Sequence, residues 1–156
     1  MLASDYQDQH CSIARSLELI GERWTLLILR DVFTGRRRFD QIQRSLGVAR
    51  NVLTARLARL VAEGILYRRR YQERPERYEY RLTEKGLDLW PVLVSLLAWG
   101  DRHLAEEADP PVVLLHRECG GRVNDRRICE DCGAELGVRD AIALEGEEAR
   151  RALAPA

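Results

Sequence analysis

The feature that most constrains this fold is a change of hydrophobic period near residue 65. Before it, four stretches have apolar residues at helical spacing, and each stops at a glycine: residues 12–20, 22–33, 39–46 and about 49–63. After it, residues 65–71 and 78–82 have strand-like patterns, separated by a polar turn with a proline. Two short helices joined by a tight glycine turn, followed by a hairpin, predict a winged helix-turn-helix of the α+β class, mainly α.

A long helix is predicted after the hairpin. Thr83 is a suitable N-cap, and the helical pattern runs from Glu84 to about Ala105. Pro91 lies inside it and should either kink the helix or displace its start. The apolar stripe comprises Leu87, Trp90, Leu93, Val94 and Leu97. A stripe this large is rarely left exposed, so it predicts a homodimer interface or, alternatively, packing onto the same subunit.

Charge is distributed unevenly along the 156 residues. The formal net charge is zero, yet residues 36–85 contain 14 basic and 6 acidic residues, and the rest contains 11 basic and 19 acidic ones. A basic segment favours a polyanionic partner. Every basic residue except Lys85 is arginine, whose forked guanidinium suits phosphates and guanine edges. Codon bias in a GC-rich genome would also explain the arginine excess, but it would not explain the segregation.

Composition narrows the class of protein further. With 46% hydrophobic and 32% charged residues, the chain is typical of a folded globular protein. No apolar run reaches the roughly 18 residues that a membrane helix needs. The first residues have neither the basic nor the apolar region of a signal peptide. We therefore expect a cytoplasmic protein without a membrane partner.

The fourth helical segment carries the residues expected to read double-stranded DNA. Its leucines should face the core, which leaves other side chains outward or on the flank: Arg50, Asn51, Thr54, Ala55, Arg56 and Arg59. Arginine can pair with guanine and asparagine with adenine in the major groove. The alternative is an ordinary solvated helix face. The hairpin that follows favours the DNA-binding interpretation.

Further arginines are expected to hold the DNA backbone or the minor groove. Arg68 and Arg70 should share one face of the hairpin, and Arg74 and Arg77 flank its tip. Arg36, Arg37 and Arg38 precede the third helical segment and are candidate phosphate clamps.

Taken together, these segments resemble the HxlR-type family of winged helix-turn-helix regulators. The resemblance covers about residues 8–104 and rests on Cys11, residues 21–30, Arg38-Phe39, residues 52–57, 63–66 and 78–83, and Trp99. It implies a homodimer, paired through the N-terminal segment and the long helix, that binds a pseudo-palindromic operator. The chain departs from the family pattern at Glu22, where a second glycine is common, and at Val48-Ala49, where Ile-Ser is common.

Cys11 opens the first helical segment, where a helix N-terminus can lower the pKa of a thiol and favour the reactive thiolate. In several members of the resembled family a cysteine at this position senses oxidants or electrophiles. Two interpretations remain open: a redox sensor that responds to an oxidant signal, and a small apolar residue packed at the dimer interface.

The C-terminal region contains a set of metal-ligand residues with the spacing H-x2-C, nine residues, C-x2-C. They are His116, Cys119, Cys129 and Cys132. Three thiolates and one imidazole would complete a tetrahedral site for one structural zinc ion per chain, within a zinc-ribbon-like unit with strands at 112–116, 126–129 and 135–138. Water or His103 could replace His116 as the fourth ligand. There are two alternatives to a zinc site: Cys129 and Cys132 form a redox pair, or the thiols bind no ligand.

The expected organisation is a DNA-binding and dimerisation domain over residues 1–108, the zinc-ribbon-like unit over 109–145 and a flexible tail over 146–156. The predicted function is a sequence-specific transcriptional regulator, most simply a repressor. The alternative is a winged-helix and zinc-ribbon module that binds proteins of the transcription machinery. A thiol oxidoreductase is a third hypothesis, but no acid–base pair, phosphate loop or nucleophile triad supports an enzyme. The operator, the target genes and any small-molecule effector cannot be named from the sequence.

Overall fold

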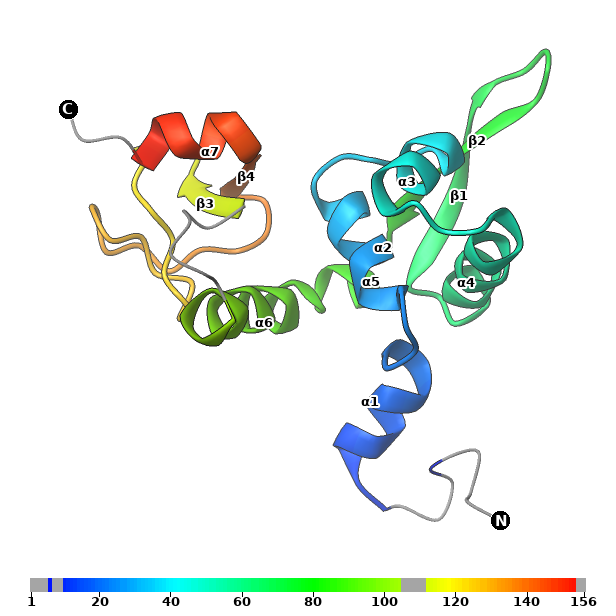
Figure 1. The fold of residues 1–156 in the computed structure, drawn as a ribbon, viewed down its shortest axis with the longest axis horizontal. Helices are drawn as coiled ribbons and strands as arrows, with labels where there is room; N and C mark the ends of the chain where they lie inside the picture. Colours follow the sequence, from blue (N-terminus) through cyan, green and yellow to red (C-terminus); the bar gives the residue numbers. More distant parts are fainter. Residues whose placement is uncertain (1–5, 7–9, 105–111, 154–156) are drawn as a thin grey trace. The chain divides into compact units, whose positions relative to one another are not determined.

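The computed structural model describes Tyr6, residues 10–104 and residues 112–153 (Figure 1). The chain divides into two compact units, Met1–Gly86 and Leu87–Ala156, which are described separately. The predicted class is confirmed: the fold is mixed α+β and mainly helical, with a winged helix-turn-helix in the first unit. The boundary differs from the predicted one at residue 108, because the long helix is grouped with the C-terminal region.

Four helices build the first unit: α1 (Ser12–Ile20), α2 (Thr25–Phe33), α3 (Phe39–Leu46) and α4 (Arg50–Ala62). Helix α2 begins three residues later than predicted because Trp24 has a φ of 80°, a left-handed conformation that interrupts a helix. Gly47 ends α3 with a φ of 61°, a conformation that favours glycine. The chain therefore turns sharply between α3 and α4.

The core of the first unit is aliphatic. The aliphatic side chains with 0–1% exposure come from three helices and the start of the hairpin: Ile28, Leu29, Ile42, Leu53, Leu57, Leu60, Ile65 and Leu66. One charged side chain, Asp31 on α2, is also fully buried and forms an ion pair with Arg30 at 2.8 Å. Leu53, Leu57 and Leu60 face inward as their spacing predicts, so the opposite side of α4 is left for solvent. Burial of this size stabilises the unit without any ligand.

The wing is an antiparallel hairpin of β1 (Leu66–Gln72) and β2 (Arg77–Leu82), close to the predicted strands. Its tip extends beyond the helices of the unit (Figure 1). The hairpin is fixed to the segment before α3, because the backbone N–H of Tyr80 donates to the carbonyl oxygen of Arg37 at 2.7 Å. The wing and the helix-turn-helix thus share one frame.

The predicted long helix is two helices, α5 (Glu84–Leu87) and α6 (Trp90–His103). Pro91 lies in the first turn of α6, where its missing N–H costs nothing, so it displaces the start of the helix. Thr83 acts as predicted at the start of α5: its hydroxyl oxygen accepts a hydrogen bond from the N–H of Gly86 at 3.1 Å. Ala105, the predicted end, lies outside the described residues.

In the C-terminal region β3 (Val112–His116) matches its prediction, but its partner is β4 (Ala141–Glu145), which was not predicted. The strands predicted at 126–129 and 135–138 are wrong. Only the isolated bridges Val123↔Cys129 and Ile128↔Glu135 occur there, because turns around the cysteines dominate this stretch.

Helix α7 (Gly146–Leu153) occupies most of the segment that was expected to be a flexible tail. Its first turn contains two glutamates and its last turn two arginines, an order that complements the helix dipole. Ala149 is fully buried, so α7 packs by one face on the unit. Among the described residues, no helix has the length and apolar character needed to cross a membrane.

Candidate nucleic-acid interface and metal centre

The first two turns of α4 present an exposed polar face. Arg50, Asn51, Thr54 and Ala55 are all exposed, as the sequence predicts. Thr54 donates its hydroxyl to the carbonyl oxygen of Arg50 at 2.8 Å, and the guanidinium of Arg50 lies 4.9 Å from the ring centroid of Phe39. These contacts restrain both side chains while their outer edges stay accessible to a ligand.

Arg56 and Arg59 differ from the other predicted DNA-binding residues of α4. Arg56 forms an ion pair with Glu22, and Arg59 lies 3.6 Å from the same carboxylate. Arg59 also donates to the carbonyl oxygen of Glu18 at 2.7 Å, in the last turns of α1. The structure therefore uses these two arginines to hold α4 against the N-terminal segment. The sequence alone could not show this, because the partners lie more than 30 residues away.

The wing carries arginines along its length and at its tip. Arg68 stacks on Tyr78, with its guanidinium 4.1 Å from the ring centroid. Arg70 shares its face and forms ion pairs with Glu73 at 3.5 Å and Glu76 at 3.3 Å. Arg74 and Arg77 are exposed near the tip. Arg74 and Arg77 thus stand beside Glu73 and Glu76 in the turn, and both glutamates are paired with Arg70.

The three arginines before α3 have separate environments. Arg36 donates to the hydroxyl oxygen of Thr34 at 2.8 Å. Arg38 is exposed, and its guanidinium lies 4.3 Å from the ring centroid of Tyr71 on the wing. Arg37 contributes its positive charge near Glu79, a half-buried wing carboxylate.

Glu79 is a residue that sequence reasoning missed. A hydrogen bond from Arg81, at 2.7 Å, is the largest cause of a lowered pKa of Glu79, and the charges of Arg69 and Arg37 add to it. Burial opposes the shift. Glu79 therefore stays ionised and gathers arginines from β1, from β2 and from the segment before α3. The signal in the sequence was that Glu79 lies in a strand with an alternating pattern and has arginines close to it in the chain.

Four ligand-type side chains converge in the C-terminal unit. The ligand atoms of His116, Cys119, Cys129 and Cys132 all lie within 4.8 Å of one another. The Nδ1 atom of His116 lies 3.1 Å from Cys119 Sγ and 3.3 Å from Cys132 Sγ, and the sulfurs of Cys119 and Cys129 are 3.3 Å apart. His103, the other residue considered as a ligand, is not part of this cluster.

The cluster fits a tetrahedral metal ion. With metal–sulfur bonds of about 2.3 Å, neighbouring ligand atoms of a zinc tetrahedron are about 3.5–3.8 Å apart, close to these separations. The backbone around the cluster is also specialised. A Cβ atom at Gly121 would lie 2.6 Å from the sulfur of Cys129, so glycine is needed there. The residues present could therefore hold a metal ion.

The pKa values of two of the cluster's thiols are shifted in opposite directions. A hydrogen bond from the backbone of Cys132 and a weaker one from Asp131 lower the pKa of Cys129 to about 6, against the opposing effect of burial. The backbone of Gly121 lowers the pKa of Cys119, but the neighbouring thiols of Cys129 and Cys132 together with burial outweigh it and raise that pKa to about 11. The first thiolate thus makes the second unfavourable, a repulsion that a cation would relieve.

Cys11 lies at the N-cap of α1 and is exposed. Hydrogen bonding to the backbone of Ala14 and, more weakly, of Ile13 lowers the pKa of the thiol. The chemistry of an accessible thiol with a favoured thiolate form is that of an oxidant-reactive group.

Helix α6 exposes a different apolar stripe from the predicted one. Trp90 and Val94 are buried within the unit, at 7% and 4% exposure. The exposed residues are Val92, Leu96 and Trp99, at 41%, 47% and 54%, and they recur at helical spacing. Two apolar faces on one short helix share a similar sequence pattern, so periodicity alone did not distinguish the buried face from the exposed one.

Apolar side chains are also exposed in the first unit. Ile13 and Leu17 on α1 are 70% and 45% exposed, and Leu27 on α2 is 40% exposed. Their helical spacing predicts an inward face, but α1 presents its two residues to solvent.

Comparison with known proteins gives a consistent result. Residues 19–108 match the family described as HxlR-like helix-turn-helix. The HTH-type transcriptional regulator Rv3095 of Mycobacterium tuberculosis is 48% identical over 135 residues, which covers 86% of this chain and 85% of the relative. A match of this length has to extend past residue 108, where the family match ends.

Two solved structures match different shares of the chain. The crystal structure of PA1607, described as a transcription factor, has a TM-score of 0.71 and 37% identity, covering 86% of this chain and 94% of that one. The redox regulator HypR in its oxidised form has a TM-score of 0.57 and 30% identity. All of HypR corresponds to 62% of this chain, so HypR has no counterpart for the remainder.

Proposed function

Because this chain belongs to the HxlR-like helix-turn-helix family, we propose that it is a transcriptional repressor that binds a pseudo-palindromic DNA operator as a homodimer. The observation that carries the proposal is the exposed face of Arg50, Asn51, Thr54 and Ala55 on the second helix of the helix-turn-helix motif. In this motif the first turns of that helix enter the major groove. Arg50 would pair with guanine and Asn51 with adenine.

The remaining arginines supply sequence-independent affinity. Phosphate contacts come from exposed arginines of the wing and of the start of α3, namely Arg38, Arg68, Arg70, Arg74 and Arg77, and from the half-buried Arg36 and Arg37. Those at the wing tip, Arg74 and Arg77, are available for the minor groove or its phosphates. Arg56 and Arg59 contribute by positioning α4, since their guanidinium groups are engaged by Glu22 and the end of α1.

The dimer uses the exposed stripe Val92, Leu96 and Trp99, together with the apolar side chains Ile13 and Leu17 of α1. Apolar stripes of this kind are seldom left open to water. A two-fold dimer sets its recognition helices about 34 Å apart, which is one turn of DNA. Leu96→Asp should yield a monomer in sedimentation equilibrium. Ile142→Asp changes another exposed apolar residue of the same unit, outside the stripe, and should leave the dimer intact. A dimer that survives Leu96→Asp would exclude this interface.

The C-terminal unit holds one structural zinc ion per chain through His116, Cys119, Cys129 and Cys132. The donor set of three thiolates and one imidazole and the close approach of their ligand atoms support this assignment. Bound zinc would neutralise the thiolates and cross-link β3 to the cysteine turns. Elemental analysis of the purified protein should find about one zinc per chain, as a four-ligand site requires. Protein that is free of metal but has an ordered C-terminal unit would exclude the assignment.

Cys11 makes the repressor responsive to oxidants. Its exposure and lowered pKa support this role. Mild diamide treatment should weaken operator binding by the wild type and leave Cys11→Ser unaffected. Equal responses of the two proteins would rule out Cys11 as the sensor.

The operator contacts are tested by selecting DNA sites with the purified protein and measuring affinities for the selected site. Arg50→Ala or Asn51→Ala should cost about 1–3 kcal/mol and relax the base preference at one position. Arg74→Ala should weaken all sequences alike and reduce the salt slope by about 0.9. Arg126→Ala removes the same charge from an exposed site in the other unit and is the matched control. If no site is selected and the control matches Arg50→Ala, the chain is instead a protein-binding module.

A further inference from the structure

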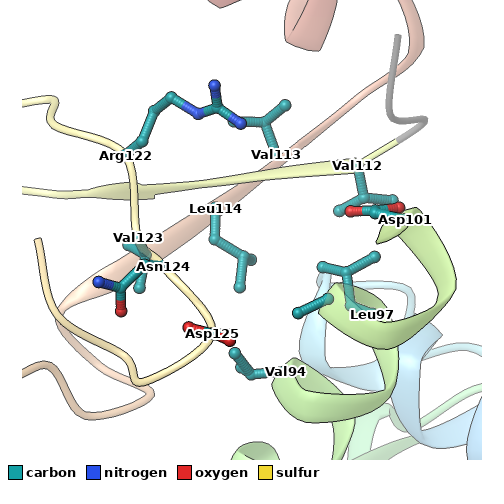
Figure 2. Close-up of a pocket in the computed structure, with 11 residues that line it drawn as sticks. Val94, Leu97, Asp101, Val112, Val113, Leu114, Arg122, Val123, Asn124 and Asp125 are labelled. Atoms are coloured by element: carbon teal, nitrogen blue, oxygen red, sulfur yellow. The ribbon is translucent and has the colours of Figure 1, made fainter. Parts of the chain in front are cut away.

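The C-terminal unit contains a cavity of about 60 Å³ between α6, β3 and the turn at residues 122–125 (Figure 2). Its lining is mixed: aliphatic side chains lie beside the polar groups of Asp101, Arg122, Asn124 and Asp125. Val94 and Leu97 of α6 and Leu114 of β3 point toward one another across it, and Val123 closes one side. A volume of this size holds about four water molecules, or a short aliphatic group.

Two acidic residues, Asp101 and Asp125, line the cavity, and they differ in the partners that the described residues give them. Asp125 accepts a hydrogen bond from Arg102 at 3.0 Å. No described residue forms a hydrogen bond or an ion pair within 4 Å with Asp101, whose carboxylate lies beside Leu97 and Val112. Burial raises the pKa of Asp101. A carboxylate with no close partner among the described residues, next to the aliphatic side chains of the cavity, favours a cationic ligand.

One cation of the protein also lines the cavity. Arg122 opposes the shift in the pKa of Asp101 through its charge. Its side chain, however, extends along the Val113 side of β3, whereas Asp101 lies on the α6 side (Figure 2). Arg122 therefore moderates the field at the cavity and leaves the Asp101 carboxylate available.

We propose that this cavity binds a primary amine with a short aliphatic chain. The ammonium group pairs with Asp101, and the alkyl chain lies between Val94, Leu97 and Leu114. A carboxylate ligand would bring a second anion next to Asp101, and a neutral alcohol would give that carboxylate no counter-ion. Asp101 thus selects ligands by their positive charge, and the aliphatic side chains select among them by the length of the alkyl chain.

The position of the cavity gives the amine a regulatory role, an extension that rests on the proposed function. Val94, Leu97 and Asp101 lie on one face of α6, and the exposed stripe Val92, Leu96 and Trp99 lies on another. If the amine binds one arrangement of α6 more tightly than another, it shifts the population of the dimer toward that arrangement. The ratio of the two affinities sets the size of the shift.

Calorimetry on the full-length, zinc-loaded protein tests the site directly. The probe is n-pentylamine, with n-pentanol and pentanoate as neutral and anionic analogues. We expect saturable binding of the amine in the millimolar range, typical of so small a ligand. Pentanol should bind at least about tenfold more weakly than the amine, because a hydrogen bond to a charged group contributes about 1.5–3 kcal/mol.

Variants locate the binding. Asp101→Asn should weaken the amine at least about tenfold by the same argument. Leu97→Phe should block the cavity while the zinc content stays unchanged. Asp88→Asn removes an exposed carboxylate of the same unit that does not line the cavity, and should change nothing. Absence of saturable amine binding, equal binding of pentanol, or an unaffected Asp101→Asn protein each overturns the proposal.

Gel shifts on the selected operator test the regulatory role separately. A change in operator affinity that the amine produces in the wild type and not in Asp101→Asn supports that role. An unchanged affinity in the wild type overturns it. Failure to bind DNA with and without amine would count against the proposed function, whereas the calorimetric result tests the amine site independently of DNA.

Discussion

The first unit and the part of the second unit from residue 112 onward are stabilised by different means. The first buries eight aliphatic side chains almost completely, contributed by helices and by the start of the wing. From residue 112 onward, the described part of the chain buries only Val113, Leu136, Ala141 and Ala149, besides two of the proposed metal ligands. Segments this short seldom fold on apolar burial alone. We infer that the DNA-binding frame folds unaided, whereas the C-terminal region depends on its ligand cluster.

Removal of the metal should have the largest effect and would test this contrast directly. With a chelator, or in Cys129→Ser, we expect β3, β4 and the cysteine turns to lose their order, because metal binding supplies the folding free energy of small zinc units. The core of the first unit should stay protected. Amide hydrogen exchange resolved by residue measures both regions in one experiment. Simultaneous loss of protection in α2 and α4 would contradict the contrast between the units.

A cavity in the first core should have the converse effect. Leu53 has 0% exposure, so Leu53→Ala should lower the free energy of unfolding of the first unit by about 2–5 kcal/mol. Urea unfolding provides the measurement, and zinc content should remain at the wild-type level. Leu17→Ala removes the same group from a residue that is 45% exposed, and should have a much smaller effect on the monomer. A loss of zinc in Leu53→Ala would show that the units depend on each other.

Gly121→Ala should act on the metal centre without changing any ligand. The added Cβ would meet the sulfur of Cys129 at 2.6 Å and Asp131 at 2.8 Å, and overpacking of this kind costs about 1–3 kcal/mol. Zinc affinity, measured by competition with a chromophoric chelator, should fall roughly tenfold to a hundredfold. Gly100→Ala, on α6 with nothing within 4 Å of the new Cβ, is the matched control. Unchanged affinity in Gly121→Ala would mean that the cluster adapts more freely than its packing indicates.

The extent to which the sequence predicted the structure also differs between the units. Glycines and local periodicity located the four helices of the first unit, since these depend on neighbouring residues. The spacing of His116 and the three cysteines predicted the cluster. The pairing of β3 with β4 was missed because it joins segments about 25 residues apart, and strand pairing at that distance has no local signature. The contacts of Arg56 and Arg59 were missed because their partners, Glu22 and Glu18, also lie far away in the sequence.

The smallest expected effect on stability concerns Glu79 and the arginines around it in the first unit. These side chains contribute to stability through charge rather than through apolar burial. The pKa of Glu79 is lowered in the folded protein, chiefly by Arg81, so the carboxylate stabilises the fold above the pKa of an unfolded glutamate, about 4.3. That contribution is lost as the pH falls through the lower, folded pKa. Glu79→Gln should therefore destabilise the first unit at neutral pH by no more than about 1 kcal/mol, the usual range for ion pairs at a protein surface.

The difference between Glu79→Gln and wild type should shrink as the pH falls from about 4.3 through the lowered, folded pKa of Glu79, below which both side chains are neutral. Urea unfolding of the two proteins from neutral to acidic pH measures it, and Glu76→Gln at the exposed turn of the wing is the control. A difference that stays constant with pH would mean that Glu79 contributes by its shape and packing. The charge network between the wing and the segment before α3 would then be an outcome of the fold, and would not help to set the position of the wing.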